Sequence, residues 1–158
     1  MPLKRHPAAV ARDGEPLVRV PLDTALVATL RSSYAQIRSH ERKLAEVFYA
    51  KLFAAAPHLR TMFHDDLTSQ AAKLIAALDT VVQNFEHPAG NTAFLTALGR
   101  RHASYGARPE HYDLVVDLLV DSMRDVGCAK LCETDLREWK RALRLVAAQM
   151  IAASANPA

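Results

Sequence analysis

The sequence has few of the residues that mark β-sheets, disulfide frameworks and membrane spans. Its 158 residues include only five glycines and two cysteines, and aromatic residues make up 6% of the chain. Strand-type alternation is nearly absent, whereas half of the residues are hydrophobic. This composition favours an all-α fold, and the length suits one domain with a sizeable core. No apolar run reaches the length of a membrane span, so we expect no membrane partner.

Charge and cysteine content also narrow the class of protein. The formal net charge of +3 is small, and the basic residues are interleaved with acidic ones, as on a solvated surface. We therefore expect no nucleic-acid partner. Cys128 and Cys132 have a spacing that fits neither a zinc ribbon nor a thioredoxin motif. Residues 1–16 lack the apolar core of a secretory signal, so reduced thiols in a cytoplasmic protein are the expectation, with a regulatory disulfide as the less favoured alternative.

The chain divides into a domain and two short ends. Residues 1–21 combine prolines with scattered charges, which predicts a disordered N-terminal extension. Residues 22–153 form the predicted domain, and residues 154–158 form a predicted disordered tail.

Apolar residues at helical spacing predict about seven helices of unequal length joined by short links. Asp23 or Thr24 is the predicted cap of the first helix, and Ser39 that of the second. The sequence His87–Asn91 is expected to break the chain before a short helix that carries His102. The predicted helices follow the apolar stripes Leu26–Ile37, Leu44–Leu52, Pro57–Phe63, Leu74–Phe85, Phe94–His102, Tyr112–Val126 and Leu136–Met150.

His102 is the most informative single residue. Phe94, Leu95 and Leu98 share its helix face at offsets of eight, seven and four residues. A lone histidine on an apolar face is more often a hydrogen-bonded core residue than a ligand. However, Gln70 and Tyr112 lie on neighbouring helices, and an imidazole against an apolar wall with polar groups nearby is what a haem pocket requires.

Four segments with their spacing resemble a known family. They are Phe48–Phe53, Pro57–Phe63, Gln70–Leu74 and His102–Tyr112. In these segments the chain resembles the globin domains of flavohaemoglobins and single-domain bacterial haemoglobins, over about residues 22–153. The resemblance implies an all-α globin fold, with about seven steeply crossing helices around haem b, which is iron protoporphyrin IX.

The resemblance also implies roles for the residues that would face the iron. His102 is similar to the proximal ligand of the haem iron, and Tyr49 to the distal tyrosine that donates a hydrogen bond to bound oxygen. Gln70 and Leu74 resemble the two distal residues of the long helix, and Phe63 the aromatic residue that wedges the haem. Each of these residues also suits an ordinary core or helix surface.

Further residues are expected at the edge of the haem. Tyr112 is similar to the tyrosine that touches the proximal side, and Leu98 belongs to the apolar wall beside His102. Lys73, Arg100 and Arg101 are candidate partners for the haem propionates, because a carboxylate gains from a nearby cation, although simple solvation explains each of them as well.

The chain departs from the family pattern near both faces of the haem. The link before Gln70 is three residues shorter than the common form, and His64 within it is an alternative sixth ligand. Ser154 stands where the family has a proximal glutamate, which predicts weaker oxygen activation unless Glu133 or Glu138 takes that role.

The sequence leaves several functions open. The favoured reading is a globin that reversibly binds oxygen and other diatomic gases (NO, CO) at ferrous iron, as in oxygen transport, and acts as a monomer or homodimer. One alternative is a nitric oxide dioxygenase with weak peroxidase activity, served by a separate reductase because the chain has no Gly-rich dinucleotide loop. Others are a gas or redox sensor that uses the N-terminal extension or the Cys128/Cys132 pair, and a haem-free helical interaction domain.

Overall fold

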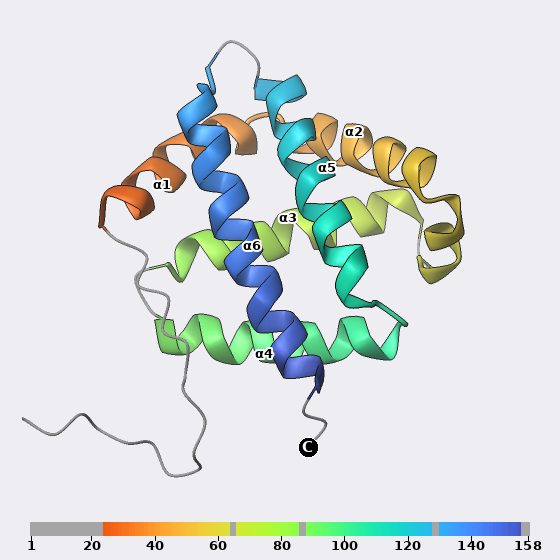
Figure 1. The fold of residues 1–158 in the computed structure, drawn as a ribbon. Helices are drawn as coiled ribbons and strands as arrows, with labels where there is room; N and C mark the ends of the chain where they lie inside the picture. Colours follow the sequence, from red (N-terminus) through yellow and green to blue (C-terminus); the bar gives the residue numbers. More distant parts are fainter. Residues whose placement is uncertain (1–23, 64–65, 86–87, 128–129, 156–158) are drawn as a thin grey trace, which may run out of the picture.

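The protein is an all-α fold in the computed structural model, which describes residues 24–63, 66–85, 88–127 and 130–155. These residues contain six α-helices, one 3₁₀ helix and no strand (Figure 1). The prediction of an all-α chain with about seven helices is therefore confirmed. None of the described helices is both long and apolar enough to cross a membrane. The elements are α1 (Thr24–Arg38), α2 (Glu41–Ala55), η1 (Pro57–Met62), α3 (Leu67–Gln83), α4 (Pro88–Ser104), α5 (Pro109–Gly127) and α6 (Glu133–Ala155).

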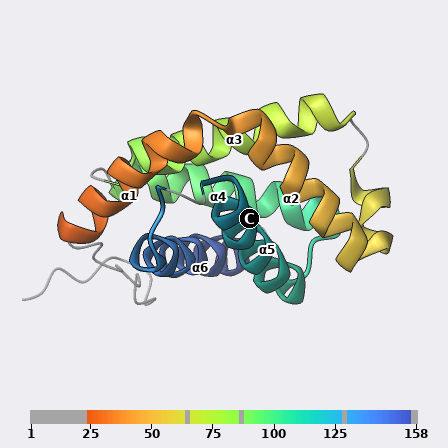
Figure 2. The same ribbon diagram turned by 90° about the horizontal axis from the view of Figure 1, so that it is seen from above.

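The helices pack in two groups, one around α6 and the other around α2. Helix α6 packs on α1, α4 and α5, and Figure 1 shows its C-terminal half crossing α4. Helix α2 packs on α5, α3 and η1. Figure 2, viewed from above, shows α3 on the side of the molecule opposite α6. The main packing partners of α3 are α1 and α2, whereas that of α4 is α6, so α3 and α4 belong to different groups.

The centre of the core joins α1 to α6. Trp139 is fully buried, and its indole Nε1 donates a hydrogen bond to the Ser33 hydroxyl at 2.9 Å. The Tyr34 ring lies beside it, with ring centroids 5.8 Å apart. A buried indole N–H needs such an acceptor, because leaving it unpaired costs about 1–3 kcal/mol.

Helix α4 is longer than expected. The sequence predicted a short helix after a break over His87–Asn91, but α4 begins at Pro88 and has 17 residues. That prediction was wrong, because proline at the first helical position lacks only an N–H that has no partner in the helix. The expected stop is confirmed, since α4 ends at Ser104 and Gly106 follows with φ of +93°.

The helix caps differ from the predictions at two places. The Asp66 side chain accepts a hydrogen bond from the Ser69 N–H at 2.8 Å, so α3 begins at Leu67 rather than at Ser69. Ser39 was predicted to cap α2, but it does not. Its hydroxyl donates instead to the Gln36 carbonyl of the preceding helix at 2.7 Å. His40 occupies the cap position, but its side chain makes no capping hydrogen bond to α2.

The predicted domain ends are only partly within the described residues. The predicted extension over residues 1–21 lies outside them. Helix α6 continues through Ala155, two residues beyond the predicted end of the domain, so Ser154 and Ala155 are helical.

A glycine sets the distance between α4 and α6. A Cβ atom at Gly99 would lie 2.3 Å from the Met150 carbonyl oxygen and 2.8 Å from the Met150 Cα. Only a residue without a side chain permits this backbone approach. The contact fixes α4 against α6 one turn before His102.

Candidate haem site

His102 is held in one orientation near the end of α4. The ring is half-buried, and its Nδ1 lies 2.9 Å from the Leu98 carbonyl oxygen. A carbonyl oxygen only accepts hydrogen bonds, so Nδ1 carries the proton and the Nε2 lone pair stays available. Burial lowers the pKa of His102, which favours the neutral ring that a metal requires. Nε2 contacts no hydrogen-bonding group among the described residues.

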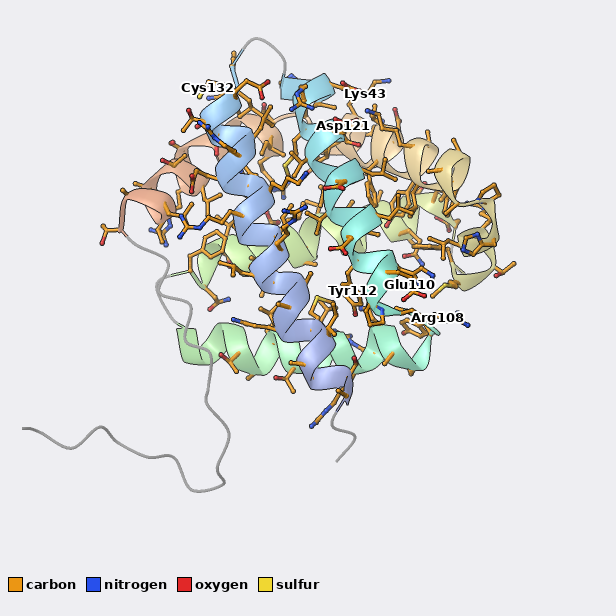
Figure 3. The ribbon with its side chains drawn as sticks, in the orientation of Figure 1. Lys43, Arg108, Glu110, Tyr112, Asp121 and Cys132 are labelled. Atoms are coloured by element: carbon orange, nitrogen blue, oxygen red, sulfur yellow. The ribbon has the colours of Figure 1, made fainter. Side chains whose placement is uncertain are left out.

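Tyr112 lies beside His102 and has an unsatisfied hydroxyl. It is on the first turn of α5, at the end of that helix nearer to α4, as Figure 3 shows, and its ring centroid is 6.2 Å from that of His102. The hydroxyl oxygen is buried, with no hydrogen-bond partner in the described part of the chain. Burial raises the pKa of Tyr112. A buried hydroxyl without a partner is costly, so a hydrogen-bonding group from outside the described residues would stabilise this position.

Four large apolar side chains of the candidate site are only half-buried. They are packed against the core but not enclosed by it, although they are typical core residue types. They come from α3, from α4 and from the segment between η1 and α3. Helix α3 packs mainly on α1 and α2, whereas α4 packs mainly on α6. An apolar ligand between these elements would complete their burial. The residues concerned are Phe63, Leu74, Phe94 and Leu98.

An aromatic cluster holds Phe63 in place. The Phe63 ring is 5.6 Å from the Tyr49 ring and 5.3 Å from the Phe53 ring, both in edge-to-face geometry. Tyr49 and Phe53 stack on each other along α2 at 5.9 Å. Such contacts fix ring orientations and add to the energy of burial. Phe63 is therefore positioned by α2, at the point where the chain enters the link to α3.

Tyr49 connects α2 to the first turn of α3. It is 6% exposed, and its hydroxyl donates a hydrogen bond to the Gln70 backbone carbonyl at 3.2 Å. Burial raises the pKa of Tyr49 to about 12, so the hydroxyl stays protonated. The two residues lie together, as their predicted roles require, but the contact uses the backbone of Gln70. The hydroxyl proton of Tyr49 is therefore already used in a hydrogen bond within the protein.

The cations predicted for the haem propionates lie at the surface. Lys73, Arg100 and Arg101 are exposed on α3 and α4. Within the described ranges neither Arg100 nor Arg101 has an ion-pair partner. His64, the alternative sixth ligand, lies outside the described residues.

No acidic side chain takes the place of the missing proximal glutamate among the described residues. The Ser154 hydroxyl donates to the Ile151 carbonyl at 2.7 Å. Glu133 pairs with Arg124 at 3.5 Å, and Glu138 pairs with Arg141 at 3.6 Å. The suggestion that one of these glutamates assists His102 is therefore wrong in this structure. The Nδ1 partner of His102 is a carbonyl group instead.

Other candidate features add no second metal site to the described residues. They contain no group of three or more His, Cys, Asp or Glu side chains placed to hold a metal ion. Cys132 is a free, exposed thiol, while Cys128 lies outside the described residues. Sequence reasoning missed the part that Gly99 plays beside His102. A glycine inside a helical stripe was the available signal.

The sequence comparisons agree with this geometry. The family model described as Globin matches residues 46–150. The chain is 28% identical over 109 residues to a Flavohemoprotein of Rhizobium meliloti, covering 67% of this chain and 27% of that protein. A Flavohemoprotein of Bacillus subtilis is 22% identical over 129 residues, covering 80% and 32%. The chain thus spans about a quarter to a third of the length of these relatives.

Solved structures show the same fold. An engineered carbene transferase, made from a nitric oxide dioxygenase candidate of Rhodothermus marinus, has a TM-score of 0.76 and 25% identity, over 85% of this chain and 94% of that one. A bacterial globin of Campylobacter jejuni has a TM-score of 0.73 and 19% identity, over 84% and 96%. A hexacoordinated haem protein from a tardigrade has a TM-score of 0.79 and 17% identity, over 87% and 98%. The family match covers most of the chain, so this protein belongs to the globin family.

Proposed function

We propose that this globin binds haem b through Nε2 of His102 and reversibly binds oxygen and other diatomic gases. One observation carries the proposal: the Leu98 carbonyl orients His102, no group among the described residues bonds its Nε2, and the half-buried side chains of Phe94 and Leu98 share its helix face. The globin family match and the flavohemoprotein relatives support the same conclusion.

The residue types at the candidate site fit a porphyrin. Phe63, Leu74 and Leu98 offer apolar surface for its faces, and burying that surface would stabilise the complex by about 25 cal/mol per Å². Lys73 and Arg101 are exposed, as partners of carboxylates at a solvent edge would be. When bound, the haem would supply an iron with one open position for a gas.

Tyr49 is the proposed hydrogen-bond donor to the bound gas. Its hydroxyl now donates to the Gln70 carbonyl at 3.2 Å, so the hydroxyl must leave one acceptor to reach another. A neutral hydrogen bond contributes about 0.5–1.5 kcal/mol, whereas one to a charged acceptor contributes about 1.5–3 kcal/mol. Oxygen bound at a haem would carry negative charge, so the exchange of acceptors would be favourable. The gain would be smaller than for a hydroxyl that had no partner to give up.

The second candidate function is nitric oxide dioxygenation with electrons from a separate reductase. It is supported by the flavohemoprotein relatives, of which this chain matches about a quarter to a third. The contact of His102 Nδ1 with a carbonyl, rather than a carboxylate, makes the imidazole a weaker donor to a metal. We therefore place gas binding first, with moderate dioxygenase and weak peroxidase activity as secondary properties.

Visible spectra of the purified protein test the first function. We expect a Soret band in the ferric, ferrous and oxygenated forms, and a pyridine haemochrome spectrum that identifies haem b. A protein that shows no Soret band even after haem is added would contradict the proposal. Nitric oxide consumption with a supplied reductase, measured against the same assay without reductase, tests the second function.

A further inference from the structure

The joint between α4 and α5 carries an exposed aromatic ring among arginines. Tyr105, just after the end of α4, is 59% exposed, although large hydrophobic side chains are usually covered. Arg100 lies on the last turns of α4, and Arg108 precedes α5. We call these three residues the α4–α5 patch.

The positive charges of this patch are not neutralised by the described part of the protein. Arg100 has no ion-pair partner there. The Arg108 side chain is 74% exposed, and its Nη1 lies 4.0 Å from Oε1 of Glu110. Figure 3 shows Arg108 and Glu110 at the outer edge of the molecule. An exposed pair at that distance contributes little, so the patch is electrostatically positive.

Three aspartates along α5 differ from this patch, because each of them has a basic partner. Asp125 pairs with Lys51 at 2.7 Å, Asp121 with Arg124 at 2.7 Å, and Asp117 with Lys140 at 2.8 Å. In Figure 3, Asp121 lies near the opposite end of α5 from Arg108. These acids are locally compensated. Among the described residues, the arginines of the α4–α5 patch therefore differ from these aspartates, because they have no ion pair shorter than 4.0 Å.

We propose that the α4–α5 patch docks an acidic electron-transfer protein that reduces the haem iron. This inference rests on the proposed function. Tyrosine and arginine are enriched among the residues that contribute most to binding, and unpaired arginines attract an acidic surface. Docking here would place the partner's redox group against the end of the helix that holds His102. Small, charge-steered interfaces suit such transient encounters.

The transfer itself is a one-electron step. The reduced centre of the partner loses one electron and is oxidised, and ferric haem iron gains it and becomes ferrous. No covalent bond forms or breaks, and no proton moves. The patch contributes orientation and a higher encounter rate, and charge steering of this kind raises association rates by about 10–10³.

Stopped-flow reduction of the haem-loaded, full-length protein tests the proposal. The probe is a reduced, small, acidic [2Fe–2S] ferredoxin. We expect a second-order rate constant that falls as salt is added, because screening weakens charge steering. The double variant Tyr105→Ala/Arg108→Glu should lower that constant at low salt about tenfold. The dissociation constant of oxidised ferredoxin, measured by calorimetry, should rise in the same variant.

A matched variant controls for general charge and exposed apolar area. Leu67 is 42% exposed on α3, and Arg42 is exposed on α2 without an ion-pair partner within the described ranges. Leu67→Ala/Arg42→Glu also replaces one exposed large side chain by alanine and one arginine by glutamate. This control should be reduced by ferredoxin at the wild-type rate. Photoreduced deazariboflavin, a small neutral donor, should reduce all three proteins equally.

Equal ferredoxin rates in the patch variant and the matched control would overturn the proposal. So would patch-dependent binding of anionic vesicles or single-stranded DNA without binding of ferredoxin, because the patch would then serve another class of partner. A failure of the proposed function has a separate signature, namely the absence of a Soret band before any donor is added.

Discussion

The hydroxyl groups of two tyrosines at the candidate site are in opposite situations. The Tyr49 hydroxyl, from α2, donates to the Gln70 carbonyl at 3.2 Å. The Tyr112 hydroxyl, from α5, is buried with no partner among the described residues. Burial raises the pKa of both phenols, so both remain neutral hydrogen-bond donors. On the α2–α3 side the protein satisfies its own polar group, whereas on the α4–α5 side it leaves one open beside His102.

The difference separates stability from binding. A satisfied hydroxyl contributes to folding and must give up its partner before it serves a ligand. An unsatisfied hydroxyl lowers the stability of the fold, and it can form a hydrogen bond to a ligand that binds beside it. The α4–α5 side therefore depends more on an incoming group, and the following changes test that asymmetry in order of expected effect.

The largest effect is expected from His102→Ala. Loss of the only proposed iron ligand on the α4 side should abolish the native haem spectrum, or make it depend on added imidazole. Titration of the variant with haem, monitored at the Soret band, measures this. His111→Ala is the control, because its Nδ1 already accepts a hydrogen bond from the Arg108 N–H at 3.1 Å. An unchanged spectrum in His102→Ala would assign the iron to another residue.

Gly99→Ala should destabilise the α4 side strongly. The new methyl group would meet the Met150 backbone at 2.3 Å, and a backbone cannot rotate away. We expect a loss of about 1–3 kcal/mol in the free energy of unfolding, measured by urea denaturation. Gly127→Ala is the matched control, because its new methyl would meet only the flexible Leu131 side chain. Equal losses in the two variants would show that the α4–α6 contact tolerates separation.

High pH should weaken the α2–α3 side through Tyr49. Its pKa is about 12 in the folded protein and 10.0 as a free side chain. Between these values the unfolded chain ionises first, so stability present below pH 10 is lost as the pH rises toward 12. Tyr49→Phe should flatten this decline in urea midpoints, whereas Tyr105→Phe, at an exposed position, should not. A decline of equal slope in Tyr49→Phe would assign it to other groups.

Tyr49→Phe should also speed oxygen loss. Removing the hydroxyl removes one hydrogen bond to the bound gas, and about 1.4 kcal/mol corresponds to about a tenfold higher off-rate. Flash photolysis or stopped-flow displacement by carbon monoxide measures it. If the off-rate stays at the wild-type value, the hydroxyl never leaves the Gln70 carbonyl.

Tyr112→Phe should have the smallest effect on folding, with the opposite sign. The variant removes a buried hydroxyl that has no partner in the described structure, so stability without haem should stay equal or rise by about 1 kcal/mol. Paired urea denaturation of Tyr112→Phe and Tyr49→Phe without haem checks the contrast. A destabilised Tyr112→Phe would reveal a partner for its hydroxyl, such as an ordered water.

Local patterns predicted most of the helices but not all of their ends. The stripe through Leu30, Tyr34 and Ile37 is buried in α1, because residues three and four apart share one helix face. The short helix expected around His102 was wrong, since proline and glycine break a helix interior but not its first turn. The Ser39 cap was also wrong, because its hydroxyl found a nearer carbonyl in α1.

The sequence by itself determined the all-α class, the apolar stripes and the presence of His102 on one of them, because these follow from spacing along a single helix. Only the tertiary structure decided the partners across helices: the Gln70 carbonyl for Tyr49, the Met150 backbone against Gly99, and no partner in the described chain for Tyr112. Such contacts join residues far apart in the chain. They depend on crossing angles and distances that periodicity does not contain.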